Sequence, residues 1–256
     1  MRSPRPETPL RAVATTDDTI LGGRLRLLQP ARGHRVGHDA ILLAAAAPAA
    51  KHAVDLGAGV GTAGLALLAR GAAARVTFVE IDPALAALAR ENAVRNGFGE
   101  RAEVIVADVR KFARPKDAAL AADLALFNPP FNDPGRRNVS PDAGRRRAHA
   151  AADSELDPWL ATAERALAPA GSLVMIHRPD ALATILASLT GRFGAAEIIP
   201  IFPRPGAAAI RVILRAIKGR RTPISLRPGL VLNEADGRPS AAAEAILREA
   251  ASLDPA

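Results

Sequence analysis

The chain has 256 residues, of which 49% are hydrophobic, so it can build one large α/β core. It contains no cysteine, which excludes disulfides and thiolate metal sites and agrees with a reducing compartment. The net charge of +8 comes almost entirely from arginine and favours a polyanionic partner, although a GC-rich genome gives the same composition.

The longest apolar stretch, 41–50, is interrupted by Pro48 and is too short to cross a bilayer. The first residues combine prolines with charges and lack the apolar core of a signal peptide. We therefore expect a disordered lead-in over 1–14 and a soluble cytoplasmic protein. Residues 19–30 predict a hairpin with a Gly-Gly turn, and after a second turn at 33–37 an apolar helix is expected to begin near Asp39.

Strands and helices then alternate, which predicts βαβ units and a mostly parallel sheet. The clearest helix follows Asp82-Pro83, a capping residue with proline at the first helical position, and ends at Gly97. Another is expected from about Leu156 to Leu167, before Pro169 and Gly171. Short apolar runs mark seven strands, at 53–56, 75–81, 103–107, 122–127, 172–177, 197–202 and 209–216.

The predicted fold is a doubly covered α/β sheet of seven strands with helices on both faces. The last strand follows the sixth too closely for a crossover helix, so it is expected to return antiparallel. We expect a single domain over 15–256. It consists of an N-terminal hairpin and turn (15–38), a Rossmann-like core (39–217) and a C-terminal extension (218–256) with a final helix from Ala241 to Ala251.

A glycine loop follows the first core strand, at Gly57, Gly59 and Gly61, and opens a helix. Glycines there let the backbone approach a nucleotide-like ligand. Glu80 ends the next strand, where a carboxylate can accept both ribose hydroxyls. Asp55 precedes the loop and would repel a pyrophosphate, but it would stabilise the ammonium and sulfonium of a methionine-derived ligand. Asp108, at the end of the third strand, can accept from an adenine amine or cap a helix.

Asn128-Pro129-Pro130-Phe131 follows the fourth strand. The prolines hold the chain extended and leave carbonyl oxygens free as acceptors. The lone pair of an aromatic amine is delocalised, so it attacks poorly unless acceptors draw on its two N–H bonds. The Asn128 side chain and the Pro129 carbonyl can do this, while Phe131 stacks on an extruded base. The segment therefore predicts methyl transfer to a planar amine, against the alternative of a merely rigid strand exit.

Five arginines lie just past this segment, against two aspartates between residues 131 and 150. Such a local excess of positive charge favours binding to nucleic acid. The arginines are Arg136, Arg137, Arg145, Arg146 and Arg147.

Together these motifs resemble the class I, Rossmann-like N-methyltransferases that use S-adenosylmethionine. Within them the chain is most similar to the bacterial tRNA adenine-N6 methyltransferases that modify the purine beside the anticodon of a valine tRNA. The resemblance covers roughly 17–240. It is carried by 21–23 with 29–30, by 33–40, by the glycine loop, by 80–83, 91–93 and 96–97, by 128–131, and by 140–142 with 148–149.

The resemblance implies that Gly37 and Asp39 flank the methionine end of the cofactor and that Glu80 binds the ribose. It also implies that Asp108 lies beside the adenine. We assign Ile81, Val109 and Asn128 to this cofactor site as well. Phe131 departs from the Tyr of many adenine enzymes, and Phe there is common in guanine-N2 enzymes. The target base is therefore less firmly predicted than the reaction.

Several alternatives stay open. Glutamine-N5 methyltransferases of release factors use the same tetrapeptide, but usually with a helical N-terminal domain that this chain lacks. A nicotinamide-dependent oxidoreductase is supported only by the spacing of Gly59, Gly61 and Gly64, and a catalytically idle RNA-binding protein is also conceivable.

Trp159 is expected in the core rather than on a substrate platform, and 218–221 as a solvated turn rather than a phosphate clamp. The histidines have no metal-ligand spacing, so no metal site is expected. A monomer is expected.

Overall fold

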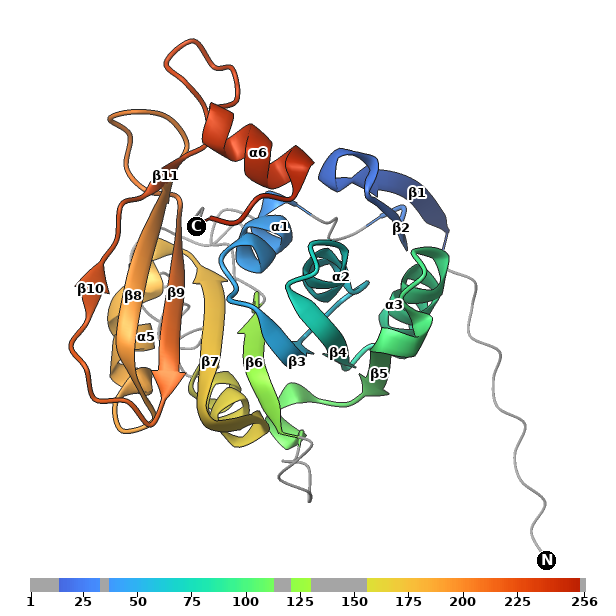
Figure 1. Ribbon diagram of the computed structural model, residues 1–256, viewed down its shortest axis with the longest axis horizontal. Helices are drawn as coiled ribbons and strands as arrows, with labels where there is room; N and C mark the ends of the chain where they lie inside the picture. Colours follow the sequence, from blue (N-terminus) through green and yellow to red (C-terminus); the bar gives the residue numbers. More distant parts are fainter. Residues whose placement is uncertain (1–13, 33–36, 113–120, 130–155, 254–256) are drawn as a thin grey trace, which may run out of the picture.

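The computed structural model describes residues 14–32, 37–112, 121–129 and 156–253. Its main sheet has the strand order β10-β8-β9-β7-β6-β3-β4-β5, with β11 beside β8 (Figure 1). The seven long strands match the predicted ones. They are β3 (Ala50–Leu56), β4 (Ala73–Glu80), β5 (Ala102–Val106), β6 (Ala122–Phe127), β7 (Leu167–His177), β8 (Phe193–Phe202) and β9 (Arg211–Lys218).

The predicted antiparallel last strand is confirmed. β9 lies between β7 and β8 and pairs antiparallel with both, whereas the pairs from β7 to β5 across the sheet are parallel. The sheet is larger than expected by two short strands, because β10 (Ser225–Leu226) and β11 (Leu230–Val231) run parallel along β8. The mostly parallel α/β fold is thus the predicted one, extended at one edge by the C-terminal segment.

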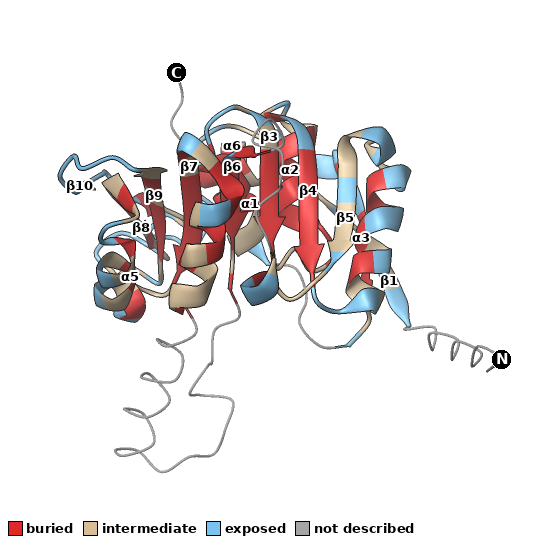
Figure 2. Ribbon diagram, turned by 90° about the horizontal axis from the view of Figure 1, so that it is seen from below, coloured by how far each residue is buried: buried red, intermediate tan, exposed pale blue. Residues whose placement is uncertain are grey.

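Helices cover both faces of the sheet, since alternate side chains of a strand point to opposite faces. In β6, Leu124 and Leu126 pack in one core cluster with α1 (His38–Ala45) and α2 (Thr62–Ala69). Ala125 and Phe127 pack in the other, with the helix over 156–166 and α5 (Leu182–Leu189). Figure 2 shows the central strands buried between these layers.

The predicted start and end of α3 (Pro83–Arg95) are confirmed. Asp82 precedes the helix, and its carboxylate accepts hydrogen bonds from the backbone N–H groups of Ala84 and Leu85, at 2.8 and 3.4 Å. Gly97, with φ of +75°, follows the helix in the left-handed conformation that its C-terminus needs. Local sequence thus fixes both ends of this helix.

The expected N-terminal hairpin is formed by β1 (Thr15–Ile20) and β2 (Leu25–Pro30), joined by the short η1 (Leu21–Gly23). Leu25 and Leu27 are buried, whereas Arg26 is exposed. The hairpin forms a separate two-stranded sheet, and its alternating leucines attach it to the core.

Asn92 of α3 and Asn96, the residue that follows this helix, bind the free edge of β2. The Asn92 side chain accepts from Leu28 N at 2.7 Å and donates to Leu28 O at 2.9 Å, and Asn96 does the same for Arg26, at 3.0 and 2.8 Å. Residues four apart on a helix and two apart on a strand have similar spacing, so the two amides act as a substitute strand. Asn92 also donates to Val60 O at 3.0 Å, which links the hairpin to the glycine loop.

The C-terminal segment returns across the molecule to the hairpin. After β11, helix α6 (Ala241–Glu249) contacts η1 and α1, and its Arg248 carbonyl accepts from the Arg24 side chain at 2.9 Å. Arg70, at the end of α2, donates to the carbonyls of Ala44 and Ala250 and so joins the ends of α1 and α6. In the part of the chain that the structure describes, no helix is long and apolar enough to cross a membrane.

Candidate active site

The candidate site lies at the carboxyl edge of the parallel strands. β6, β3, β4 and β5 are neighbours in this order, so the segments that follow them meet at one edge, where α/β sheets bind ligands. Four sequence-predicted groups are brought together in this way. They are the loop at Gly57–Gly61, the pair Glu80 and Ile81, the pair Asp108 and Val109, and Asn128 with Pro129.

The glycine loop needs its glycines for two different reasons. Gly57, Gly59 and Gly61 have φ of +69°, +58° and +89°, which other residues rarely adopt. A Cβ on Gly57 would lie 2.5 Å from Trp159 Cη2, whereas a Cβ on Gly59 would meet no described atom within 4 Å. Gly57 thus packs against the protein, and Gly59 faces open space that a ligand can fill.

Asp55 has a partner that the sequence did not predict. Its side chain is buried and accepts a hydrogen bond from Gly64 N at 2.9 Å, in the first turn of α2. Gly61, before that helix, has no side chain with which to cap it, so Asp55 supplies the acceptor from the neighbouring strand. Burial raises the pKa of Asp55 to about 7; the bond from Gly64 opposes the rise and the negative charge of Glu80 adds to it.

This pKa predicts a pH dependence of folding. The unfolded carboxyl loses its proton near its ordinary pKa of 3.8, whereas the folded one keeps it up to about 7, so the folded state binds more protons in between. The free energy of unfolding therefore falls as the pH rises through this window, by up to about 1.4 kcal/mol per pH unit, and levels off above it.

The contribution of Asp55 can be isolated with Asp55→Asn, which keeps an acceptor for Gly64 N but does not titrate. Urea unfolding of the ligand-free parent and variant at several pH values should show a difference in stability that changes in the variant's favour as the pH rises, and stops changing above about 7. Parallel curves would mean that Asp55 titrates normally.

Glu80 holds the loop and the next turn together. It is buried at the end of β4, and its two carboxylate oxygens accept from Gly59 N at 2.8 Å and Asp82 N at 2.9 Å. Each carboxylate oxygen can accept more than one hydrogen bond, so the group can still receive ribose hydroxyls. Glu80 therefore also fixes the glycine loop, in addition to the ribose contact that the sequence predicts for it.

The residues predicted near an adenine differ in exposure. The Ile81 side chain is 60% exposed although it is apolar, whereas Val109 is buried. Asp108 caps the short η3 (Val109–Lys111) by accepting from Arg110 N at 3.0 Å and also pairs with the Arg110 guanidinium, which lowers the pKa of Asp108. The capping role considered from sequence is thus present, and Ile81 offers an uncovered apolar surface at the same edge.

Gly37 and Asp39 begin α1, where Gly37 is the N-cap. The Asp39 carboxylate pairs with the Arg211 guanidinium at 2.8 Å, between residues 172 positions apart. Arg211 is the first residue of β9, and its neighbour Val212 pairs with His177 at the carboxyl end of β7. This ion pair therefore places Asp39 at the same edge of the sheet as the glycine loop.

Asn128 carries a buried acceptor with no partner. Its Oδ1 receives no hydrogen bond from any residue that the structure describes, although buried polar atoms are normally paired. It directly follows Phe127, which pairs with Leu56 of β3 and Met175 of β7, so Asn128 lies beside the start of the glycine loop. Pro129 is buried next to it. An acceptor held in this way suits a ligand that donates.

Other predicted site residues lie outside the described residues. They are Pro130, Phe131, Arg136, Arg137, Arg145, Arg146 and Arg147.

Two further residues belong to the site's surroundings. Trp159 is half-buried, not fully in the core, and lies against Phe127 with ring centroids 5.7 Å apart, besides facing Gly57. The Thr62 hydroxyl, at the start of α2, is another buried oxygen without a partner in the described ranges. Neither role could be predicted from the sequence, because both depend on contacts between distant segments. Among the described residues, no cluster of His, Asp and Glu suits a metal.

Comparisons with known proteins agree with this geometry. Residues 36–200 match the family model described as the methyltransferase small domain. The chain is 32% identical over 208 residues to a tRNA1(Val) (adenine(37)-N6)-methyltransferase of Aeromonas hydrophila, covering 79% of this chain and 84% of that protein. A protein of the same name from Bacteroides fragilis is 29% identical over 184 residues, covering 70% and 76% of the two chains.

A solved structure is also similar. It is described as a predicted O-methyltransferase, protein Atu636 from Agrobacterium tumefaciens, and is 30% identical with a TM-score of 0.67, covering 84% of this chain and 98% of that one. The matched residues include the glycine loop, Glu80, Asp108 and Asn128. The chain therefore belongs to the methyltransferase small domain family and is an S-adenosylmethionine-dependent methyltransferase.

Proposed function

We propose that the protein methylates the N6 amine of an adenine in tRNA. The observation that carries the proposal is the unpartnered, buried Asn128 Oδ1 beside the start of the glycine loop. An exocyclic amine donates two hydrogen bonds, and an asparagine oxygen followed by proline carbonyls offers acceptors for both. The amine that would receive the methyl group thus has two hydrogen bonds to donate, and the proposed slot has two oxygens to accept them.

The described residues suit the methyl donor. When bound, S-adenosylmethionine supplies an electrophilic methyl group on a sulfonium. We assign the ribose hydroxyls to Glu80, the adenine to the exposed face of Ile81 with Val109 and Asp108, and the methionine end to Gly37, Asp39 and the loop at Gly57, Gly59 and Gly61. Asp55 acts beneath the loop, through Gly64. The open space at Gly59 and the uncovered Ile81 support these assignments.

The chemistry asked of Asn128 and Pro129 is orientation and polarisation. If their oxygens accept the two N–H bonds of the amine, the nitrogen pyramidalises and directs its lone pair toward the methyl group, and its extra proton can leave to solvent after transfer. No strong base is needed, because the product cation is acidic. Pro130 and Phe131 complete the segment in this proposal, with Phe131 stacked on the base.

RNA as the substrate is supported by charge and by the relatives' names. The chain carries +8, with Arg136, Arg137, Arg145, Arg146 and Arg147 next to the catalytic segment in sequence. The Aeromonas and Bacteroides proteins are named as methyltransferases of tRNA adenine. The cytoplasm and a monomeric state are part of the proposal, and a chain without cysteine is compatible with a reducing compartment.

Other methyl-accepting groups differ in how well they match this slot. The Agrobacterium protein is described as an O-methyltransferase, but a hydroxyl has one hydrogen to donate, which leaves one of two acceptors unpaired. Guanine N2 offers the same amine geometry as adenine N6, so these two bases must be separated by experiment.

The proposal is tested by incubating the purified protein with unmodified tRNA transcripts and a donor labelled with a deuterated methyl group. Nucleoside mass spectrometry is expected to find labelled N6-methyladenosine. Labelled N2-methylguanosine would show instead that guanine is the target base. If calorimetry shows that the donor binds but no tRNA yields a labelled nucleoside, tRNA is refuted as the substrate.

A further inference from the structure

A second basic surface lies at the opposite edge of the sheet. The segment Lys218-Gly219-Arg220-Arg221 forms the turn after β9, and Lys218 pairs with Phe193 at the start of β8. These ends mark the amino edge of the parallel strands, whereas the candidate active site lies at the carboxyl edge. β9 runs from one edge to the other in eight residues, which is about 26 Å along the strand.

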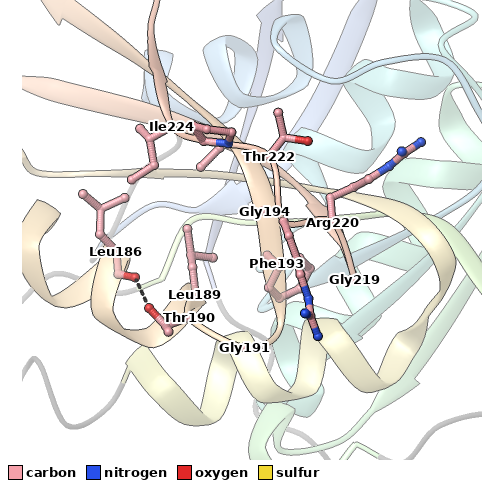
Figure 3. A pocket seen from close by; sticks show the side chains of 13 residues that line it. Leu186, Leu189, Thr190, Gly191, Phe193, Gly194, Gly219, Arg220, Thr222 and Ile224 are labelled. Atoms are coloured by element: carbon pink, nitrogen blue, oxygen red, sulfur yellow. Dashed lines mark hydrogen bonds between the residues drawn. The ribbon is translucent and has the colours of Figure 1, made fainter.

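The turn borders a cavity of about 530 Å³, between the end of α5 and the β9–β10 connection (Figure 3). Leu186, Leu189 and Ile224 form one apolar side, and the Arg220 side chain extends outward from the other. The cavity is large enough for one nucleotide, and none of the described residues that line it is acidic.

Arg220 and Arg221 differ from the cations around them. Nearby Arg192 pairs with Asp157 at 2.6 Å, and Lys218 donates to the carbonyl oxygens of Glu164 and Leu167. Arg220 and Arg221 are exposed, and neither has an ion pair with any residue that the structure describes. Their positive charge is therefore available to a partner.

The backbone that carries the two arginines is held in place. Gly219 N donates to Arg192 O at 2.9 Å, and Thr222 O accepts from Ala195 N at 2.9 Å, so each end of the turn is bonded to the segment that begins β8. Gly194 allows this close packing, because a Cβ there would lie 2.2 Å from Arg220 O. A fixed turn loses less conformational freedom on binding than a mobile tail does.

We propose that this surface, consisting of Arg220, Arg221 and the adjoining cavity, binds the phosphate backbone of the RNA substrate away from the methylated base. The inference rests on the proposed function. Arginine forks bind phosphate oxygens in a bidentate manner, and the cavity accommodates a nucleotide that is not stacked in a helix. The two edges are about 26 Å apart along β9, so we place on this surface a part of the RNA that lies outside the target stem-loop.

The test compares two substrates of the parent and of the charge reversals Arg220→Glu and Arg221→Glu. One substrate is a full-length tRNA that the parent methylates, and the other is the isolated stem-loop with the same target base. Each reversal is expected to raise KM for the full-length tRNA roughly tenfold, with kcat and the affinity for S-adenosylhomocysteine unchanged, and to leave KM for the stem-loop as it was. The salt dependence of KM should also weaken.

Arg75→Glu is the matched control, because Arg75 is an exposed arginine near the amino end of β4. In the strand order of the sheet, β7, β6 and β3 separate β4 from β9. This reversal makes the same change in net charge and should leave both KM values as they are. Equal effects of all three reversals would overturn the inference, because net charge alone would then explain them. It would also be overturned if neither Arg220→Glu nor Arg221→Glu had an effect. Failure of the parent to methylate any tRNA would instead refute the proposed function.

Discussion

Replacing Asn128 with alanine is expected to lower kcat by at least about 100-fold, with a much smaller loss of affinity for the methyl donor. The reason is the position of its Oδ1, which is buried and unpartnered among the described residues and lies beside the glycine loop. Alanine removes the acceptor that polarises the amine, so the barrier to transfer rises. The measurement is single-turnover methylation of tRNA with saturating donor, together with calorimetry of S-adenosylhomocysteine binding.

Two matched substitutions separate chemistry from folding at this position. Asn128→Asp keeps an acceptor oxygen of the same reach, so it should retain more activity than Asn128→Ala. Asn128→Leu fills a similar volume without an acceptor and should be as inactive as alanine. If the Asn128→Ala or Asn128→Leu variant methylates tRNA at the parent rate, Asn128 does not act on the reacting amine.

Replacing Glu80 with alanine is expected to weaken S-adenosylhomocysteine binding by roughly 100-fold. The carboxylate accepts from Gly59 N and Asp82 N, so its loss leaves two backbone donors without a partner and releases the loop. The proposed bonds to the ribose hydroxyls are lost as well. Hydrogen bonds to a charged group contribute about 1.5–3 kcal/mol each, which accounts for an effect of this size.

Glu80→Gln and Glu103→Gln provide the controls. Glutamine at position 80 keeps one acceptor oxygen and should give an intermediate loss of affinity. Glu103 lies on the neighbouring strand β5 and is exposed, so its neutralisation makes the same charge change outside the site and should leave the affinity as it was. An unchanged affinity in the alanine variant of Glu80, with its circular dichroism also unchanged, would remove Glu80 from the cofactor site.

Much of the fold follows from local sequence. The Asp82-Pro83 start and the Gly97 end of α3 depend on capping and on φ preferences within a few residues, so they are readable without the structure. The same holds for the strand positions, because a run of apolar residues bounded by turns behaves alike in many contexts. The antiparallel return of β9 also follows, since the connection from β8 is too short for a crossover.

The site residues that lie at the ends of strands could be predicted from the sequence. Glu80, Asp108 and Asn128 each follow an apolar run, and the carboxyl ends of parallel strands meet at one edge. The partners of Asp55 and Asp39 were not predictable. Nothing near Asp55 in sequence indicates that it caps α2 through Gly64, and nothing near Asp39 indicates Arg211, 172 positions away.

The α/β class, the glycine loop and the acceptor segment at Asn128 can be predicted from the sequence, because they depend on spacing and on backbone preferences. The contacts between distant side chains come only from the folded structure. It placed Trp159 against Gly57, bound the edge of β2 to Asn92 and Asn96, and left Arg220 and Arg221 exposed beside a cavity. The physical reason is that capping and periodicity act within a few residues, whereas burial and pairing depend on how whole elements pack.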